Sequence, residues 1–238
     1  MRSKWKNIWL LLMGLIVIVL YVFGNERNKT REVANIEVRF TGDEPPFIAY
    51  SAVNKLLIQN EDSLSGLLKE KVVLNEMEGR LEDHAMVRKA EVFLTINGEI
   101  GAKIEQRNPV ARIVGSPDYY LDADGLKMPL SDVYAARVPL VTGISERQHQ
   151  LILPLVLKLA DDPLMHQLVT GMKMTEGDEV TLFLRTHSLS VSFGEPNDLD
   201  EKIRNFKAFY QKAKRDGTLE QYHKVDLRFG NQVVATKR

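Results

Sequence analysis

Alternating hydrophobic and polar positions predict a small unit of strands and helices in the first part of the chain. Apolar residues alternate with charged residues over 36–40, which is typical of a half-buried strand. Apolar residues at helical spacing follow over 50–59, and a second helix is predicted to begin at Asn75, where Glu78 matches a capping box. We interpret the acidic residues of that second helix as its solvated face: Glu76, Glu78, Glu82 and Asp83.

The clearest pattern is a predicted β-hairpin. Two runs of alternating residues, 90–96 and 100–104, flank the dipeptide Asn97-Gly98. Asn-Gly favours a tight hairpin turn because both residues tolerate positive φ. The order strand, helix, helix, strand, strand therefore predicts a small α+β module over 33–107.

The remaining chain, 109–238, is predicted to consist mostly of strands, interrupted by one long amphipathic helix. Three short β runs, over 171–175, 180–185 and 189–193, form a meander. A long amphipathic helix that begins near Leu199 precedes a last pair of strands. The predicted fold class is therefore α+β.

The N-terminal residues predict a membrane anchor. No charged residue occurs over 7–24, and we predict a transmembrane helix over 8–24. The apolar core of sixteen residues reaches about 24 Å as a helix, near the lower limit for crossing a bilayer. No small-residue cleavage pattern follows it, which favours an anchor over a signal peptide. Three preceding basic residues predict a cytoplasmic tail at 1–7, an extracytoplasmic body and membrane lipid as a partner of the helix.

Composition and motifs exclude several classes of function. The 32 basic and 32 acidic residues balance, so no basic excess indicates nucleic acid as a partner. There is no cysteine, and the five histidines show no metal-ligand spacing. No phosphate-binding loop or nucleophile elbow occurs, and we interpret residues 122–125 as a tight turn rather than a calcium loop. We therefore expect no catalytic residue, no metal and no cofactor, which favours a binding protein over an enzyme.

Three stretches of the sequence resemble the bacterial cell-division family FtsQ/DivIB. They lie at 84–92, at 105–113 followed by 120–125, and at 222–229, where the run Val-Asp-Leu-Arg occurs. Each stretch alone is short. Together with the order of the predicted elements, the resemblance covers essentially the whole chain.

The resemblance implies a fold, a function and partners. The module over 33–107 is expected to be a POTRA domain. It is followed by the family's β domain over 109–238, which is expected to be a mostly antiparallel, extended β-sheet with flanking helices. The protein is expected to be a non-enzymatic scaffold of the cytoplasmic membrane at the division septum. Its expected partners are FtsB-like and FtsL-like division proteins (DivIC and FtsL in Gram-positive bacteria) and other divisome components, through which it helps control septal peptidoglycan synthesis. The partner-binding residues implied by the match are Arg228, Phe229, Gly230, Asn231, Gln232, Val233, Val234 and Ala235.

The final predicted strand, 232–235, has two interpretations. As an exposed sheet edge it accepts a strand from a partner through main-chain hydrogen bonds. As an ordinary closing strand it is already paired on both sides. Two other functions remain as alternatives: another POTRA-type envelope assembly protein, or a membrane-tethered envelope hydrolase, which needs paired acids or a metal cluster.

Overall fold

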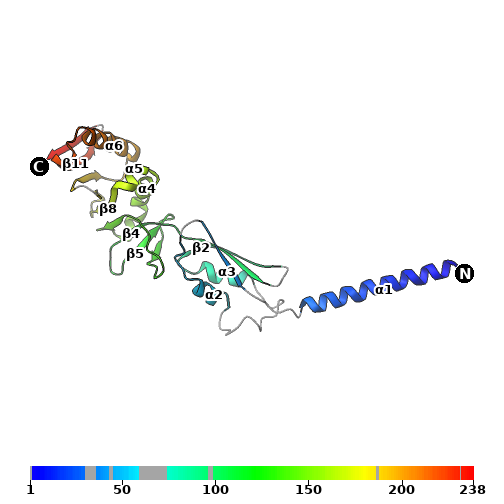
Figure 1. Cartoon of the computed structure of the whole chain (residues 1–238). Helices are drawn as coiled ribbons and strands as arrows, with labels where there is room; N and C mark the ends of the chain where they lie inside the picture. The colour runs from blue at the N-terminus through cyan, green and yellow to red at the C-terminus, as the bar shows by residue number, and fades with distance from the viewer. Residues whose placement is uncertain are drawn as a thin grey trace. The chain divides into compact units, whose positions relative to one another are not determined.

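The computed structural model describes residues 2–29, 36–42, 45–58, 74–95, 99–185, 188–230 and 232–238. The chain divides into two compact units, Met1–Gln106 and Arg107–Arg238 (Figure 1).

In the first unit, a three-stranded sheet carries two short helices. Its elements are α1 (Arg2–Lys29), β1 (Ile36–Thr41), α2 (Tyr50–Ile58), α3 (Leu74–Glu82), β2 (Val87–Leu94) and β3 (Ile100–Gln106). β3 lies in the middle of the sheet, parallel to β1 and antiparallel to β2. α2 packs against β1 and α3, and α3 packs against β2.

The core of this unit is formed by the apolar faces of the two helices and of the sheet. Val53 and Leu57 of α2 are buried, as are Met77 and Leu81 of α3, next to sheet residues such as Ile104. Both predicted helices are therefore confirmed. The predicted hairpin is also confirmed by the antiparallel pairing of β2 with β3, while its Asn97-Gly98 turn lies outside the described residues.

Two glutamates of α3 cover the outer edge of β2. Oε1 of Glu78 accepts a hydrogen bond from the backbone N–H of Val92 at 2.8 Å, and Oε1 of Glu82 accepts one from the N–H of Ala90 at 3.1 Å. β3 pairs with the other side of β2, so these two N–H groups belong to the edge that no described strand covers. The interpretation of the acids as a solvated face is therefore wrong for Glu78 and Glu82, because they satisfy backbone donors that a sheet edge leaves unpaired. Glu76 and Asp83 are exposed, as predicted.

The predicted transmembrane helix over 8–24 is also wrong. Residues 2–29 do form one helix, α1, but nowhere in the described ranges does a helix combine the length and apolar character that crossing a membrane requires. The uninterrupted apolar core is sixteen residues long, with charged residues on either side. A spanning helix typically needs about 20 consecutive apolar residues.

The second unit is built around a nine-stranded sheet. Its strands are β4 (Pro109–Ile113), β5 (Tyr119–Asp122), β6 (Lys127–Pro129), β7 (Leu140–Thr142), β8 (Val169–Met174), β9 (Val180–Leu184), β10 (Ser190–Gly194), β11 (Tyr222–Phe229) and β12 (Gln232–Lys237). Its helices are α4 (His149–Asp161), α5 (Pro163–Leu168), α6 (Leu199–Arg215) and the short 3-10 turns Glu146–Gln148 and Leu219–Gln221. The strands lie in the order β12-β11-β10-β9-β8-β7-β4-β5-β6.

This sheet mixes antiparallel and parallel pairs. β8, β9 and β10 form the predicted antiparallel meander. β4 with β7, β7 with β8, and β10 with β11 are parallel pairs. Parallel neighbours need a crossover, often a helix; α4 and α5 connect β7 to β8, and α6 connects β10 to β11. The chain is thus a mixed α/β fold with a large β-sheet, in place of the predicted class with its membrane-spanning helix.

α6 covers the sheet next to its last strands. Ile203, Phe206, Tyr210 and Ala213 recur at helical spacing and are buried, and they belong to one core cluster with Val225 of β11. This confirms the predicted amphipathic helix. The face of β11 and β12 that looks toward α6 is therefore apolar and covered.

Replacing Glu78 tests how the edge of β2 is closed. Glu78→Ala leaves the N–H of Val92 without its carboxylate, and a hydrogen bond to a charged group contributes about 1.5–3 kcal/mol. We expect a lower free energy of unfolding and faster hydrogen exchange at the Val92 amide. Glu76→Ala, which removes an exposed acid of the same helix, is the control and should change neither. Unchanged exchange at Val92 in Glu78→Ala would contradict this role.

Candidate functional site

β12 is the outermost strand at one end of the nine-stranded sheet (Figure 1). It pairs with β11 through the register Val225–Ala235 and Asp226–Val234. On its other side, no strand of the described part of the chain pairs with it. Such a strand presents a row of backbone donors and acceptors for an added strand.

The register shows which backbone groups of β12 point outward. The N–H of Arg238 donates to the carbonyl of Gln221 at 2.8 Å, so Arg238 points toward β11. Backbone groups of successive residues in an antiparallel strand point alternately to the two sides. Residues 232, 234 and 236 therefore point inward with residue 238. Val233, Ala235 and Lys237 direct their N–H and C=O groups away from the sheet.

The side chains of β12 also differ between its two faces. Val233 and Ala235 are partly buried and pack against the core cluster. Val234, on the opposite face, is 45% exposed, and Phe229 at the end of β11 is 56% exposed. The β12 edge, by which we mean residues 232–237 with Phe229, thus combines free backbone groups with accessible apolar side chains.

A tight turn joins β11 to β12. Phe229 pairs with Gln232 across it, and Gly230 has a φ of +56°, a conformation that favours glycine. The carbonyl of Gly230 accepts a hydrogen bond from Nδ2 of Asn205 in α6 at 3.4 Å. Asn231 lies outside the described residues.

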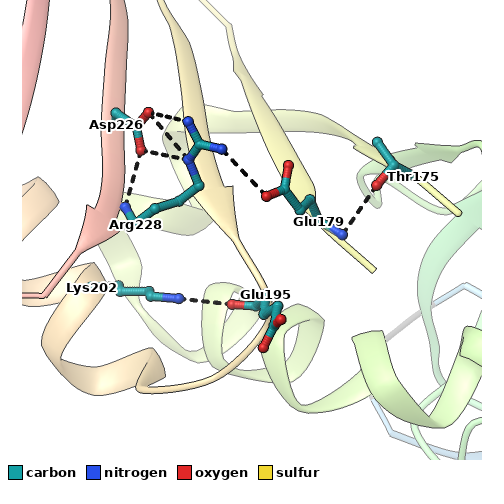
Figure 2. A network of polar contacts seen from close by, with 6 residues as sticks. All are labelled: Thr175, Glu179, Glu195, Lys202, Asp226 and Arg228. Atoms are coloured by element: carbon teal, nitrogen blue, oxygen red, sulfur yellow. Dashed lines mark hydrogen bonds and ion pairs between the residues drawn. The ribbon is translucent and has the colours of Figure 1, made fainter. Parts of the chain in front are cut away.

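Arg228 ties the end of β11 to β9 (Figure 2). Its Nη2 donates to Oδ2 of Asp226 at 2.7 Å, and its Nε donates to the same carboxylate at 3.0 and 3.2 Å. Its Nη1 donates to Oε1 of Glu179 at 3.3 Å. We call these three residues the Arg228 clamp. Because Glu179 immediately precedes β9 and Arg228 lies on β11, the clamp bridges across β10.

Gly194 at the end of β10 makes this bridge possible. It has a φ of +76°, and a Cβ atom at this position would lie 2.6 Å from Cγ of Arg228. Any side chain there would push the arginine away, since such a distance is far below van der Waals contact. The glycine thus allows the aliphatic part of Arg228 to cross the end of β10.

Both acids of the clamp are themselves held in place. The backbone N–H of Arg228 donates to Oδ1 of Asp226 at 3.1 Å. The N–H of Glu179 donates to the hydroxyl of Thr175, and the N–H of Thr175 donates to the carbonyl of Glu179, which closes the turn between β8 and β9 (Figure 2). The guanidinium therefore meets a carboxylate that its own backbone N–H holds, and a second acid whose backbone is fixed by the turn.

The clamp shifts the pKa values of Asp226 and Arg228. Hydrogen bonds from the Arg228 side chain hold the pKa of Asp226 below its ordinary value, although burial of the carboxyl acts in the opposite direction. Hydrogen bonding and the charges of Asp226 and Glu179 raise the pKa of Arg228. Asp226 and Arg228 therefore stay ionised at neutral pH.

A second polar contact fixes the loop between β10 and α6 near the clamp. Nζ of Lys202 donates to the carbonyl of Glu195 at 2.8 Å and to Oδ1 of Asn197 at 2.6 Å (Figure 2). It also lies 5.1 Å from the ring centroid of Phe193. Burial lowers the pKa of Lys202. The role of Lys202 is structural, because its ammonium group donates hydrogen bonds to the loop between β10 and α6.

The structure places the sequence-predicted site residues in different environments. Arg228 is engaged in the clamp, Phe229 and Val234 are exposed, and Val233 and Ala235 face the core with their side chains. Sequence reasoning missed the acids of the clamp and Gly194. The Val-Asp-Leu-Arg run contains Asp226 two residues before Arg228, so this signal could have identified the acid as a partner of the arginine. Glu179 is 49 residues away from Arg228, and no local sequence pattern marks it.

One comparison with known proteins spans the clamp and all of the β12 edge except Lys237. A family model described as "FtsQ/DivIB, C-terminal related" matches residues 108–236, more than half of the chain. A cell division protein FtsQ of Salinibacter ruber is 30% identical over 176 residues, which span 67% of this chain and 68% of that protein. A cell division protein FtsQ of Rhodothermus marinus is 29% identical over 174 residues, and the match spans 65% of this chain and 62% of that protein, less than two thirds of its length. The chain belongs to the FtsQ/DivIB family of cell-division proteins.

Proposed function

We propose that this protein is a non-enzymatic divisome scaffold that binds an FtsB/FtsL-like complex by accepting a partner strand at the β12 edge. Its place of action is the division septum, where it helps couple assembly of the division site to septal peptidoglycan synthesis. The observation that carries this proposal is the outermost position of β12. Membership of the family supports the role in division.

The energetics of strand addition show what the edge must supply. Three outward residues offer six backbone groups, and each hydrogen bond contributes about 0.5–1.5 kcal/mol net. The sum, about 3–9 kcal/mol, is comparable with the cost of association of about 4–15 kcal/mol. Backbone pairing alone is therefore too weak. The exposed side chains of Phe229 and Val234 provide apolar area that adds to it.

The Arg228 clamp serves this proposal as a positioning device. The register between β11 and β12 is irregular between Asp226 and Phe229, and Arg228 lies within that irregular stretch. A bulge of this kind bends a strand and changes its twist. By holding the bulge to β9, the clamp sets the direction in which the hairpin of β11 and β12 projects.

We also propose that the first unit is a POTRA-like module over 33–107. Its order of strand, helix, helix, strand, strand and its sheet order β1-β3-β2 support the proposal. In this module the edge of β2 is covered by Glu78 and Glu82. We therefore assign strand addition to β12 and not to β2.

Proline substitutions separate an outward from an inward backbone donor of β12. Val233→Pro removes an N–H that points away from the sheet, and proline is tolerated on edge strands with that orientation. We expect at least tenfold weaker binding of an FtsB-like partner in a titration, with circular dichroism and melting temperature close to those of the unmodified protein.

Val234→Pro is the matched comparison, because it removes an N–H of the ladder with β11. We expect this variant to lower the melting temperature clearly. If Val233→Pro is folded and binds the partner normally, strand addition at this edge is wrong.

Asp226→Asn tests the clamp through pH. The pKa of Asp226 is lowered in the folded protein, so its contribution to stability is present above the unfolded pKa and is lost as pH falls through the folded pKa. The unmodified protein should therefore exceed Asp226→Asn in free energy of unfolding at pH 7, and the difference should shrink below about pH 3.8, the ordinary value for this carboxyl.

Partner binding distinguishes a positioning role from general stabilisation. Asp226→Asn should weaken partner binding at pH 7 while the protein remains folded. Asp118→Asn removes another carboxyl with a lowered pKa, held by Arg112, far from β12 in the strand order, and should leave partner binding unchanged. Equal partner affinity in both variants would count against the clamp as a positioning device.

A further inference from the structure

A groove lies at the end of the large sheet opposite to the Arg228 clamp. Glu179 precedes β9 at the clamp end, and Arg185 follows β9 at the groove end. The groove forms where β7 and β8 begin, and its volume is about 910 Å³. Pro139 just before β7, Val169 at the start of β8 and Arg185 just after β9 line it.

The lining of this groove is cationic. Arg137, His166 and Arg185 border it, and none of the described lining residues is acidic. Within the described part of the chain, Arg137 forms no hydrogen bond or ion pair. Nε of Arg185 donates to the carbonyl of Gln167 at 3.3 Å, which leaves four of the five donors of this guanidinium without a described partner. The groove therefore holds two guanidinium groups that are available to an anion.

The position of Arg185 is determined by the fold. Its backbone N–H donates to the carbonyl of Leu168 at 2.8 Å. Its side chain is held by the carbonyl of Gln167, the residue that precedes Leu168. Such anchoring reduces the entropy that the side chain loses on binding an anion. A fixed guanidinium presents a fork of donors that matches a carboxylate in a bidentate geometry.

Apolar surface accompanies these charges. Val138, Pro139 and Leu168 contribute to the lining. On the neighbouring sheet surface, Leu140 is 47% exposed and Phe183 is 43% exposed. Both pair with Gly171, which lies between them and has no side chain. A ligand that extends from the groove thus meets an apolar surface beside the guanidinium groups. We call this surface, formed by Leu140, Gly171 and Phe183, the apolar shelf.

The same end of the sheet carries further basic residues near β12. Lys237 and Arg238 end the chain there, and Lys224 lies near the start of β11. Arg238 contacts the hydroxyl of Ser188, just before β10. These basic residues outnumber Glu220, the acid just before β11, and such an excess attracts ligands of the opposite sign over distances near the Debye length.

We propose that this groove binds an acidic, extended segment of a partner protein, with carboxylates of that segment paired to Arg137 and Arg185. The volume exceeds what one carboxylate or phosphate occupies and lies in the upper part of the range for ligand sites. Two guanidinium groups next to an apolar shelf fit a peptide that combines acidic and apolar residues. The site does not require strand addition at β12.

The test uses the full chain and a labelled peptide of alternating glutamate and proline, measured by fluorescence anisotropy. Proline has no N–H, so this probe is a poor strand and does not report on the β12 edge. We expect saturable binding that weakens with salt, and no binding of the matching lysine–proline peptide. Arg137→Ala and Arg185→Gln should each weaken binding at least fivefold, and the double variant at least twentyfold.

Two controls make the outcome specific. Arg147→Ala removes an exposed arginine beyond the other end of β7 and should leave the affinity unchanged, as should Val233→Pro. Equal binding by all variants would overturn the proposal. Inorganic phosphate that binds as tightly as the peptide would also overturn it, because the groove would then be a simple anion site.

Discussion

An edge strand carries backbone N–H and C=O groups that its own sheet does not pair. In this chain, the edge strands differ in length and in whether side chains cover these groups. The edge of β2 is covered by carboxylates of α3, which accept the N–H groups of Ala90 and Val92. β6, at one end of the large sheet, is only three residues long and ends at Pro129. β12, at the other end, is six residues long, with Val233 and Ala235 pointing their backbone groups outward. Short strands, proline and charged side chains are common protections of sheet edges. Of the two ends of the large sheet, β12 is therefore the edge on which binding is proposed.

An open edge recognises one partner only when its direction is fixed, and here the clamp supplies this constraint. Arg228 reaches across β10 to Glu179, and Gly194 leaves the space that the arginine needs. On the opposite face, Val233 and Ala235 rest on the core that α6 helps to form. The hairpin of β11 and β12 is therefore held from both faces while its outer side stays accessible.

The sequence predicted those parts of the structure that depend on local periodicity. The β2–β3 hairpin, the meander of β8 to β10 and the buried face of α6 each follow from the spacing of apolar residues within one element or two adjacent ones. The prediction of a membrane-spanning helix is wrong, since the uncharged run at the N-terminus contains an apolar core of only sixteen residues. The capping role of Glu78 and the clamp partner Glu179 were missed because both depend on strands or turns that are distant in sequence. Solvated acids and acids that bind a backbone edge look the same in a sequence, since only the fold brings the donors to them.

The most direct test of the account is residue-specific amide hydrogen exchange along β12, with and without the FtsB-like partner. In the free protein, the amides of Val233, Ala235 and Lys237 should exchange rapidly, while those of residues 234 and 236 should be protected by pairing with β11. Addition of the partner should protect the three outward amides and leave the inward ones nearly unchanged. Outward amides that are already protected in the free protein, or that stay unprotected in a complex that has formed, would contradict binding by strand addition at β12.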